Sequence, residues 1–187
     1  MTKSTFVVLL LLQIVCASYA AVPNGGGLAA ACKKSSNVNF CGTLLQPFAA
    51  QFSDNVPLKM GHAVAAATLA KSQAAKTFIA GQANNAKLNA NQKAAVKVCL
   101  DKVEKSLDSL KHAAREFDKM QGSKGPKRVE YRNKVIGRLT LSSNEQMACF
   151  NSMKAAGAGD IVQKVMQHVD EGAKAGFVAQ SFIQAMN

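Results

Sequence analysis

The fold is decided by residues 95–117, which read AVKVCLDKVEKSLDSLKHAAREF. Apolar side chains recur in this stretch at alternating steps of four and three residues. Such steps place them along one side of a helix, and a stripe of this length is typical of the seam between helices in a bundle. The stripe consists of Val96, Leu100, Val103, Leu107, Leu110, Ala114 and Phe117. The stretch therefore predicts a long helix that packs against others of its kind.

The same spacing on both sides of this stretch predicts three more long helices. They are expected from Pro57 to about Gly81, from about Lys127 to Gly157, and from an N-cap at Asp160 almost to Asn187. Their inward positions are predicted at Met60, Val64, Ala67, Ala70, Ala74 and Phe78, at Val135, Ile136, Leu139, Met147, Phe150 and Met153, and at Val162, Val165, Met166, Val169, Ala173, Phe177 and Ile183. No stretch alternates with a period of two. The sequence thus indicates an all-α fold, an antiparallel up-and-down four-helix bundle.

A smaller pair of helices is expected before the bundle, at residues 28–34 and 40–52. The polar run Ser35-Ser36-Asn37 separates the two, and Ser53-Asp54-Asn55 ends the second. We therefore expect one domain over residues 21–187, made of an N-terminal helical hairpin at 28–52 and the bundle at 57–187.

The first 20 residues have the features of a secretory signal peptide. Lys3 precedes an apolar run from Phe6 to Leu12, and small residues stand at Ser18 and Ala20. The run is too short to cross a bilayer as a helix, and no other stretch of membrane length follows. The sequence therefore predicts a soluble protein that is exported from the cell, without a transmembrane segment, and that acts in the extracellular space or cell wall.

The charge is strongly basic, with 23 basic against 11 acidic residues and a net charge of +12. Since Lys3 is the one charged residue in segment 1–20, the mature chain carries +11. Such a balance indicates an anionic partner, and export argues against nucleic acid. Acidic polysaccharide, anionic membrane and the acidic cleft of another protein stay open as partners.

Of the five cysteines, Cys16 lies in the signal segment, which leaves Cys32, Cys41, Cys99 and Cys149. An even number in an oxidising compartment predicts two disulfides, and four cysteines allow three connectivities. Zinc is the alternative. Because the cysteines lack CxxC spacing and His62, His112 and His168 are scattered, we expect neither a metal nor any other cofactor. No nucleophile motif accompanies the histidines, so no catalytic residues and no enzyme activity are predicted.

The densest charge in the chain lies between Lys119 and Arg138, where Glu130 is the single acidic residue. This run would either meet an acidic partner or form a solvated loop and helix face. Under the first interpretation the partner interface is formed by Lys124, Lys127, Arg128, Arg132, Lys134 and Arg138. Such charge speeds encounter and weakens with salt.

Three stretches of the mature chain resemble the plant invertase and pectin methylesterase inhibitor family. They are the cysteine-bounded segment 32–41 (CKKSSNVNFC), segment 94–110 (AAVKVCLDKVEKSLDSL), and segment 139–150 (LTLSSNEQMACF), which leads into the fourth cysteine. Pro126 and Lys127, but not Arg128, match the Pro-Lys-Phe motif of invertase inhibitors.

The resemblance implies bridges from Cys32 to Cys41 and from Cys99 to Cys149. It also implies an inhibitor without enzymatic activity, which covers the substrate cleft of its target in a one-to-one complex. Pectin methylesterase is the first expected target and acid invertase (beta-fructofuranosidase) the second, at a surface formed by the second and third bundle helices. A non-inhibitory protein that binds acidic wall polysaccharide or anionic membrane is the further alternative.

Overall fold

The computed structural model describes residues 27–33, 35, 37–53 and 57–186, and every regular element in these ranges is helical. The elements are α2 (Gly27–Cys32), α3 (Val38–Leu45), the 3-10 helix η1 (Gln46–Phe52), α4 (Pro57–Gln82), α5 (Ala90–Gln121), α6 (Gly125–Ala155) and α7 (Asp160–Ala185). None of them combines the length and the apolar composition that a membrane span needs. The expected signal peptide, residues 1–20, lies outside the described residues.

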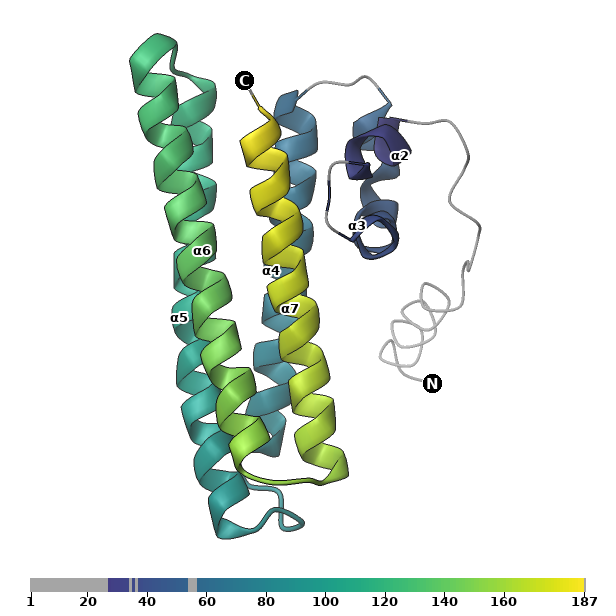
Figure 1. The fold of residues 1–187 in the computed structure, drawn as a ribbon, viewed down its shortest axis with the longest axis vertical. Helices are drawn as coiled ribbons and strands as arrows, with labels where there is room; N and C mark the ends of the chain where they lie inside the picture. Colours follow the sequence, from purple (N-terminus) through teal and green to yellow (C-terminus); the bar gives the residue numbers. More distant parts are fainter. Residues whose placement is uncertain (1–26, 34, 36, 54–56, 187) are drawn as a thin grey trace, which may run out of the picture.

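Helices α4 to α7 form an antiparallel up-and-down bundle (Figure 1). Each packs against two neighbours: α4 and α6 each contact both α5 and α7. This arrangement confirms the predicted all-α fold and bundle. The short helices α2, α3 and η1 lie against the side of the bundle that α4 and α7 form (Figure 1).

Local signals explain where the long helices begin. At the start of α5, the Asn89 Oδ1 atom accepts from the Gln92 backbone N–H at 2.9 Å, and the Gln92 Oε1 atom accepts from the Asn89 backbone N–H at 3.1 Å. Helix α6 begins at Gly125, slightly before the expected Lys127, because Pro126 suits a first helical turn, and Gly125 turns the chain into the helix with a φ of +55° that favours glycine. The predicted N-cap at Asp160 is wrong by one residue, since Gly159 holds that position.

Two apolar clusters fill the bundle, and a buried polar layer separates them. The first cluster includes the hairpin and the halves of the bundle helices beside it, and the Phe52 and Phe182 rings meet there edge to face at 6.1 Å. The second surrounds Cys99 and Cys149. The layer between them contains Thr68, Ser72, Ser106, Ser142, Ser143 and Gln146.

Gln146 is the centre of this polar layer. Its Nε2 group donates to the Ser72 hydroxyl at 3.0 Å and to the Ser106 hydroxyl at 2.8 Å, and Ser106 shares a further bond of 2.7 Å with Ser142. The bonds join α4, α5 and α6. Helix α7 approaches closely because Gly172 has no side chain, and an added Cβ there would overlap the Gln146 amide. The layer therefore holds the four helices in one register.

Four predicted inward positions are wrong: Ala70, Ala74, Met147 and Phe177 are exposed. The reason is that the polar layer and the small residues of α7 take the inward positions at this level. Gln146 points inward, which turns its neighbour Met147 toward solvent with 41% of its surface exposed. Similarly, Ala175 and Gly176 are buried and Phe177 is 45% exposed. At this level the inward positions still follow the helical period, but they are not the positions with the most apolar side chains.

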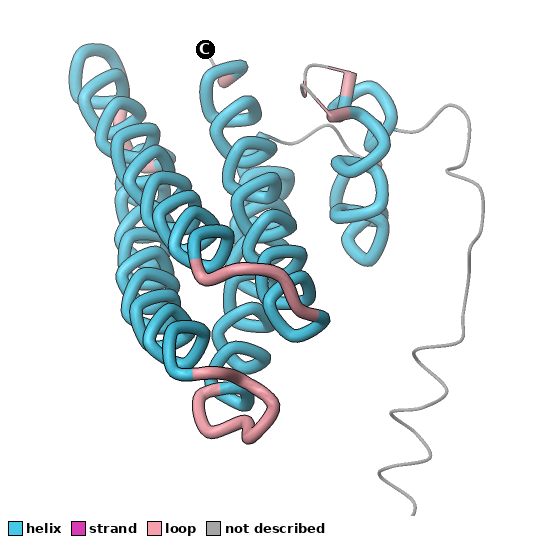
Figure 2. Tube along the Cα trace, turned by 60° about the horizontal axis from the view of Figure 1, so that its bottom comes forward, coloured by secondary structure: helices cyan, strands magenta, loops and turns pink. Residues whose placement is uncertain are grey.

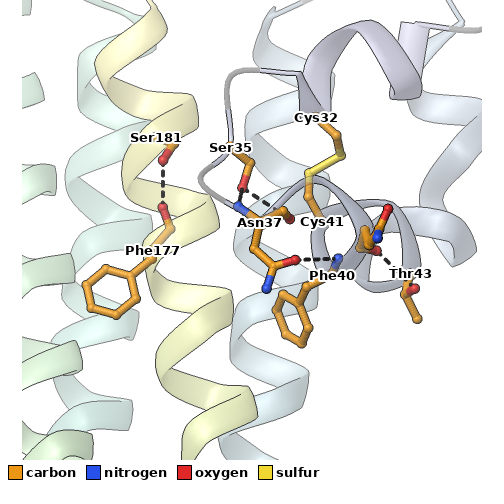
Figure 3. Close-up of a disulfide and its surroundings, with 9 residues drawn as sticks. Cys32, Ser35, Asn37, Phe40, Cys41, Thr43, Phe177 and Ser181 are labelled. Atoms are coloured by element: carbon orange, nitrogen blue, oxygen red, sulfur yellow. Dashed lines mark hydrogen bonds between the residues drawn. A yellow bond between two sulfur atoms is a disulfide. The ribbon is translucent and has the colours of Figure 1, made fainter.

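Two disulfides staple the fold. Cys32 is bonded to Cys41, which joins α2 to α3 (Figure 3), and Cys99 is bonded to Cys149, which joins α5 to α6. In the hairpin, the Asn37 side chain caps α3 by accepting from the Phe40 backbone N–H at 3.0 Å. These pairs are the ones that the family resemblance implies.

Candidate functional site

The connection between α5 and α6 projects from one end of the molecule (Figure 1). Helices α5 and α6 have 32 and 31 residues, whereas α4 and α7 have 26 each. At the end of α7, the Met186 carbonyl accepts from Arg132 Nη1 at 3.3 Å. The part of α6 before Arg132 therefore extends past α7. We call this projecting part, residues 119–131, the tip.

The six candidate interface residues lie at and behind the tip, but the structure divides them between two sides of α6. Lys127, Lys134 and Arg138 are separated by seven and four residues, so they share one flank. That flank faces α5, because Lys119 of α5 and Lys134 both lie over the Tyr131 ring, at 6.0 and 5.1 Å from its centroid. We call Lys127, Lys134 and Arg138 the cationic flank.

Arg128 and Arg132 lie apart from the cationic flank and are half-buried. Arg132 is occupied by its bond to the last turn of α7. It therefore ties α6 to α7, and an incoming partner would have to compete with an existing bond. Lys124, the sixth candidate, is exposed at the N-cap of α6.

Carboxylates neutralise part of the charge at the tip. Lys134 donates to Glu130 at 2.6 Å, and Lys119 donates to Glu116 at 2.9 Å. The hydrogen bond from Lys134 lowers the pKa of the Glu130 carboxyl, and the bond from Lys119 likewise lowers the pKa of Glu116. The bond to Glu130 also raises the pKa of Lys134. These groups therefore stay charged and paired in mildly acidic solution.

Of the six candidates, only Lys134 forms an ion pair with a carboxylate of the described residues, and three of the other five lie at the surface: Lys124, Lys127 and Arg138. All three are exposed. They are the groups at this end that are free to meet an anion. Sequence reasoning missed Tyr131, which lies between two ammonium groups, and Glu116, whose pairing with Lys119 three residues later in α5 is a local signal that could have found it.

The histidines form no catalytic group in the described part of the chain. His62 lies 3.7 Å from Asp118 and edge-on to Phe117, His168 stacks on Phe78 with 4.4 Å between ring centroids, and His112 is exposed. Over the described ranges, no three or more His, Cys, Asp or Glu side chains gather as metal ligands would.

The comparisons with known proteins agree with one another. The sequence profile of the plant invertase/pectin methylesterase inhibitor family matches residues 27–178. The fold is similar to a crystal structure of mutant form A of a pectin methylesterase inhibitor from Arabidopsis, with a TM-score of 0.69 and 13% identity over 87% of this chain and 99% of that one. A pectin methylesterase inhibitor from Arabidopsis thaliana gives a TM-score of 0.61 and 13% identity over 86% and 95% of the two chains. No curated protein sequence matches significantly.

Proposed function

The chain belongs to the plant invertase/pectin methylesterase inhibitor family, and we propose that it inhibits a pectin methylesterase by covering the substrate cleft in a one-to-one complex. Members of this family are proteinaceous inhibitors, so the chain is not an enzyme. Acid invertase is the second candidate target, because Pro126 and Lys127 match the start of the motif of invertase inhibitors. We place the action outside the cell, where the family's proteins act, and where the expected signal at residues 1–20 would direct the chain.

The observation that carries the proposal is the projecting tip with its free cations. A two-helix tip is narrow enough to enter a groove, whereas the flat side of a bundle is not. Lys124, Lys127 and Arg138 supply charge for the carboxylates of an acidic cleft. Tyr131 adds an aromatic side chain of the kind that is enriched at the centres of interfaces.

The two helices that carry the tip are cross-linked along their length, which favours tight binding. The Cys99–Cys149 bond, the ion pair of 3.0 Å between Lys102 and Glu145, and the bond between Ser106 and Ser142 all join α5 to α6. A partner that meets a rigid pair of helices loses little conformational entropy on binding. We therefore expect complex formation without a large rearrangement of the bundle.

The test is to mix the purified secreted form with plant pectin methylesterase and with acid invertase across apoplastic pH. We expect inhibition of the esterase and a one-to-one complex on gel filtration. Inhibition of invertase alone would move the target to that enzyme. If neither enzyme is inhibited at any pH in this range, the proposal is wrong.

A pair of charge-matched variants tests the site. Replacing Lys124, Lys127 and Arg138 together by glutamine should weaken inhibition by about tenfold, mainly through slower association. Replacing Lys97, Lys154 and Lys164 by glutamine removes the same charge from the other end of the bundle and should leave inhibition within about twofold. Equal losses for the two variants would mean that net charge acts, and that the tip is not the contact surface.

A further inference from the structure

A second group of basic residues lies at the end of the bundle opposite the tip. It comes from the α4–α5 connection, the first turns of α5 and α7, and the last turn of α6. The group, which we call the distal basic surface, is Lys87, Lys93, Lys97, Lys154 and Lys164. Figure 2 turns this end forward and shows the α4–α5 and α6–α7 connections together. Two separate segments of the chain contribute to it, 83–98 and 150–167, so no single charge run in the sequence reveals it.

The charge of the distal basic surface is not neutralised. None of its lysines forms an ion pair with a described residue, whereas the lysines along the sides of the bundle do. Asp160 is the one acidic residue in segments 83–98 and 150–167, which build this end. The result is a locally dense positive field that attracts a polyanion.

The distal end is also hollowed. A depression of about 240 Å³ lies between the two connections, bounded by Lys87, Gln92 and Asp160. Gln92 is buried and donates from Nε2 to the Ala158 carbonyl at 3.1 Å, which ties the α5 start to the α6–α7 connection. Lys87 therefore borders a fixed concave surface, and the other four lysines belong to the helix turns next to the two connections that form it.

We propose that the distal basic surface binds a stretch of acidic polysaccharide, the de-esterified uronate chain that a pectin methylesterase leaves as its product. The choice of this ligand rests on the proposed function, because that enzyme converts neutral methyl esters into a row of carboxylates. Every member of the surface is a lysine, whose compact and mobile charge suits many weak contacts with a flexible polyanion. The lysines surround the bundle end and do not follow one amphipathic helix, which is the arrangement that lies in a lipid surface.

The two ends of the molecule would then act together. Helix α5 alone has 32 residues, which makes it about 48 Å long. The tip and the distal basic surface are therefore far enough apart to bind an enzyme and a polysaccharide at the same time. The inhibitor would be retained where de-esterified product has accumulated, with its tip free to meet the enzyme.

The experiment measures retention of the full secreted protein on immobilised polygalacturonate, on highly methyl-esterified pectin and on anionic phospholipid vesicles, as a function of salt. We expect strong retention on polygalacturonate alone, lost with moderate salt. The variant with Lys93, Lys97 and Lys154 replaced by glutamine should bind polygalacturonate about tenfold more weakly. The variant with the same lysines replaced by arginine should retain binding.

The control is the tip variant described above, which removes the same charge and should bind polygalacturonate nearly as well as the wild type. Equal weakening by the distal and tip variants, absence of retention on polygalacturonate, or stronger retention on vesicles would each overturn the proposal. Inhibition is measured in parallel for every variant. Retention without inhibition would refute the proposed function and leave the polyanion surface standing, and inhibition without retention would do the reverse. Helical circular dichroism identifies variants that fail to fold.

Discussion

Replacing Gly61 by alanine should destabilise the protein, although alanine is the better helix former. Gly61 is buried in α4, and the Phe117 ring of α5 lies directly against its backbone. An added Cβ would overlap the Cζ atom of that ring and approach two further ring carbons at 2.8 Å. Phe117 is itself only 2% exposed, so the ring can relax only into the neighbouring apolar cavity of about 30 Å³.

The magnitude follows from two opposing contributions. Alanine in place of glycine gains about 1 kcal/mol of helix stability, whereas overpacking of a filled core costs up to about 3 kcal/mol. We expect a net loss of about 1 to 2 kcal/mol, and a fall in Tm of roughly 3 to 6 °C for a domain of this size. Because Phe117 lies at the base of the tip, inhibition should weaken as well.

The matched control is Gly81→Ala in the same helix. No atom lies within 4 Å of a Cβ added there, so this variant should be up to about 1 kcal/mol more stable than the wild type. Urea denaturation followed by circular dichroism gives both values. The Gly61→Ala/Phe117→Leu double variant should be no less stable than Phe117→Leu alone, since the smaller side chain removes the overlap. If Gly61→Ala and Gly81→Ala prove equally stable, the proposed contact between α4 and the Phe117 ring is wrong.

Three more predictions concern the disulfides, the polar layer and acid stability. Replacing Cys99 and Cys149 by serine should lower the free energy of unfolding by about 4 kcal/mol and replacing Cys32 and Cys41 by about 2.5 kcal/mol, because the bridged residues are 50 and 9 positions apart. Equal losses in urea denaturation would contradict this. Gln146→Leu should cost about 1 to 3 kcal/mol, because the Ser72 hydroxyl then loses its bond from Nε2, and adding Ser72→Ala should restore part of the loss. Burial alone would raise the pKa of Glu171, but the hydrogen bond from Lys71 and its charge outweigh burial and lower the pKa below its usual 4.5. The ion pair therefore contributes above pH 4.5 and loses its effect as the pH falls through the lowered value. Glu171→Gln should cost about 0.5 kcal/mol at neutral pH and nothing in strong acid, and a difference that persists there would refute this assignment.

The seam of α5 illustrates what can be predicted from residue spacing. All seven residues of the predicted stripe are buried or half-buried, because a helix that buries one side repeats its apolar residues with the period of the helix. The breaker cluster around Gly122 and Pro126 likewise located the α5–α6 connection to within a few residues.

Residue spacing did not predict the polar layer of the bundle. There Gln146 and Ser106 point inward and Met147 points outward. Residue spacing and polarity assign such residues to solvent, because the hydroxyl groups that accept from Gln146 Nε2 are on other helices. The bonds between Gln146, Ser72 and Ser106 exist only once three helices have met.

The candidate site was likewise predicted from the sequence only in part. The charge run from Lys119 to Arg138 is contiguous in the chain, so the sequence alone locates a basic connection. Whether each cation is free depends also on its neighbours in space, since the Met186 carbonyl at the end of another helix occupies Arg132.

The amino-acid sequence therefore determines the helices, their inner faces where those faces are apolar, and the family, because these depend on local spacing and composition. Tertiary structure alone decides which polar groups are buried, which cations form bonds with other helices, and that lysines from two separate segments gather at the distal end. The physical reason is that hydrogen bonds and electrostatic interactions depend on distances through space, and the antiparallel packing of the helices sets those distances.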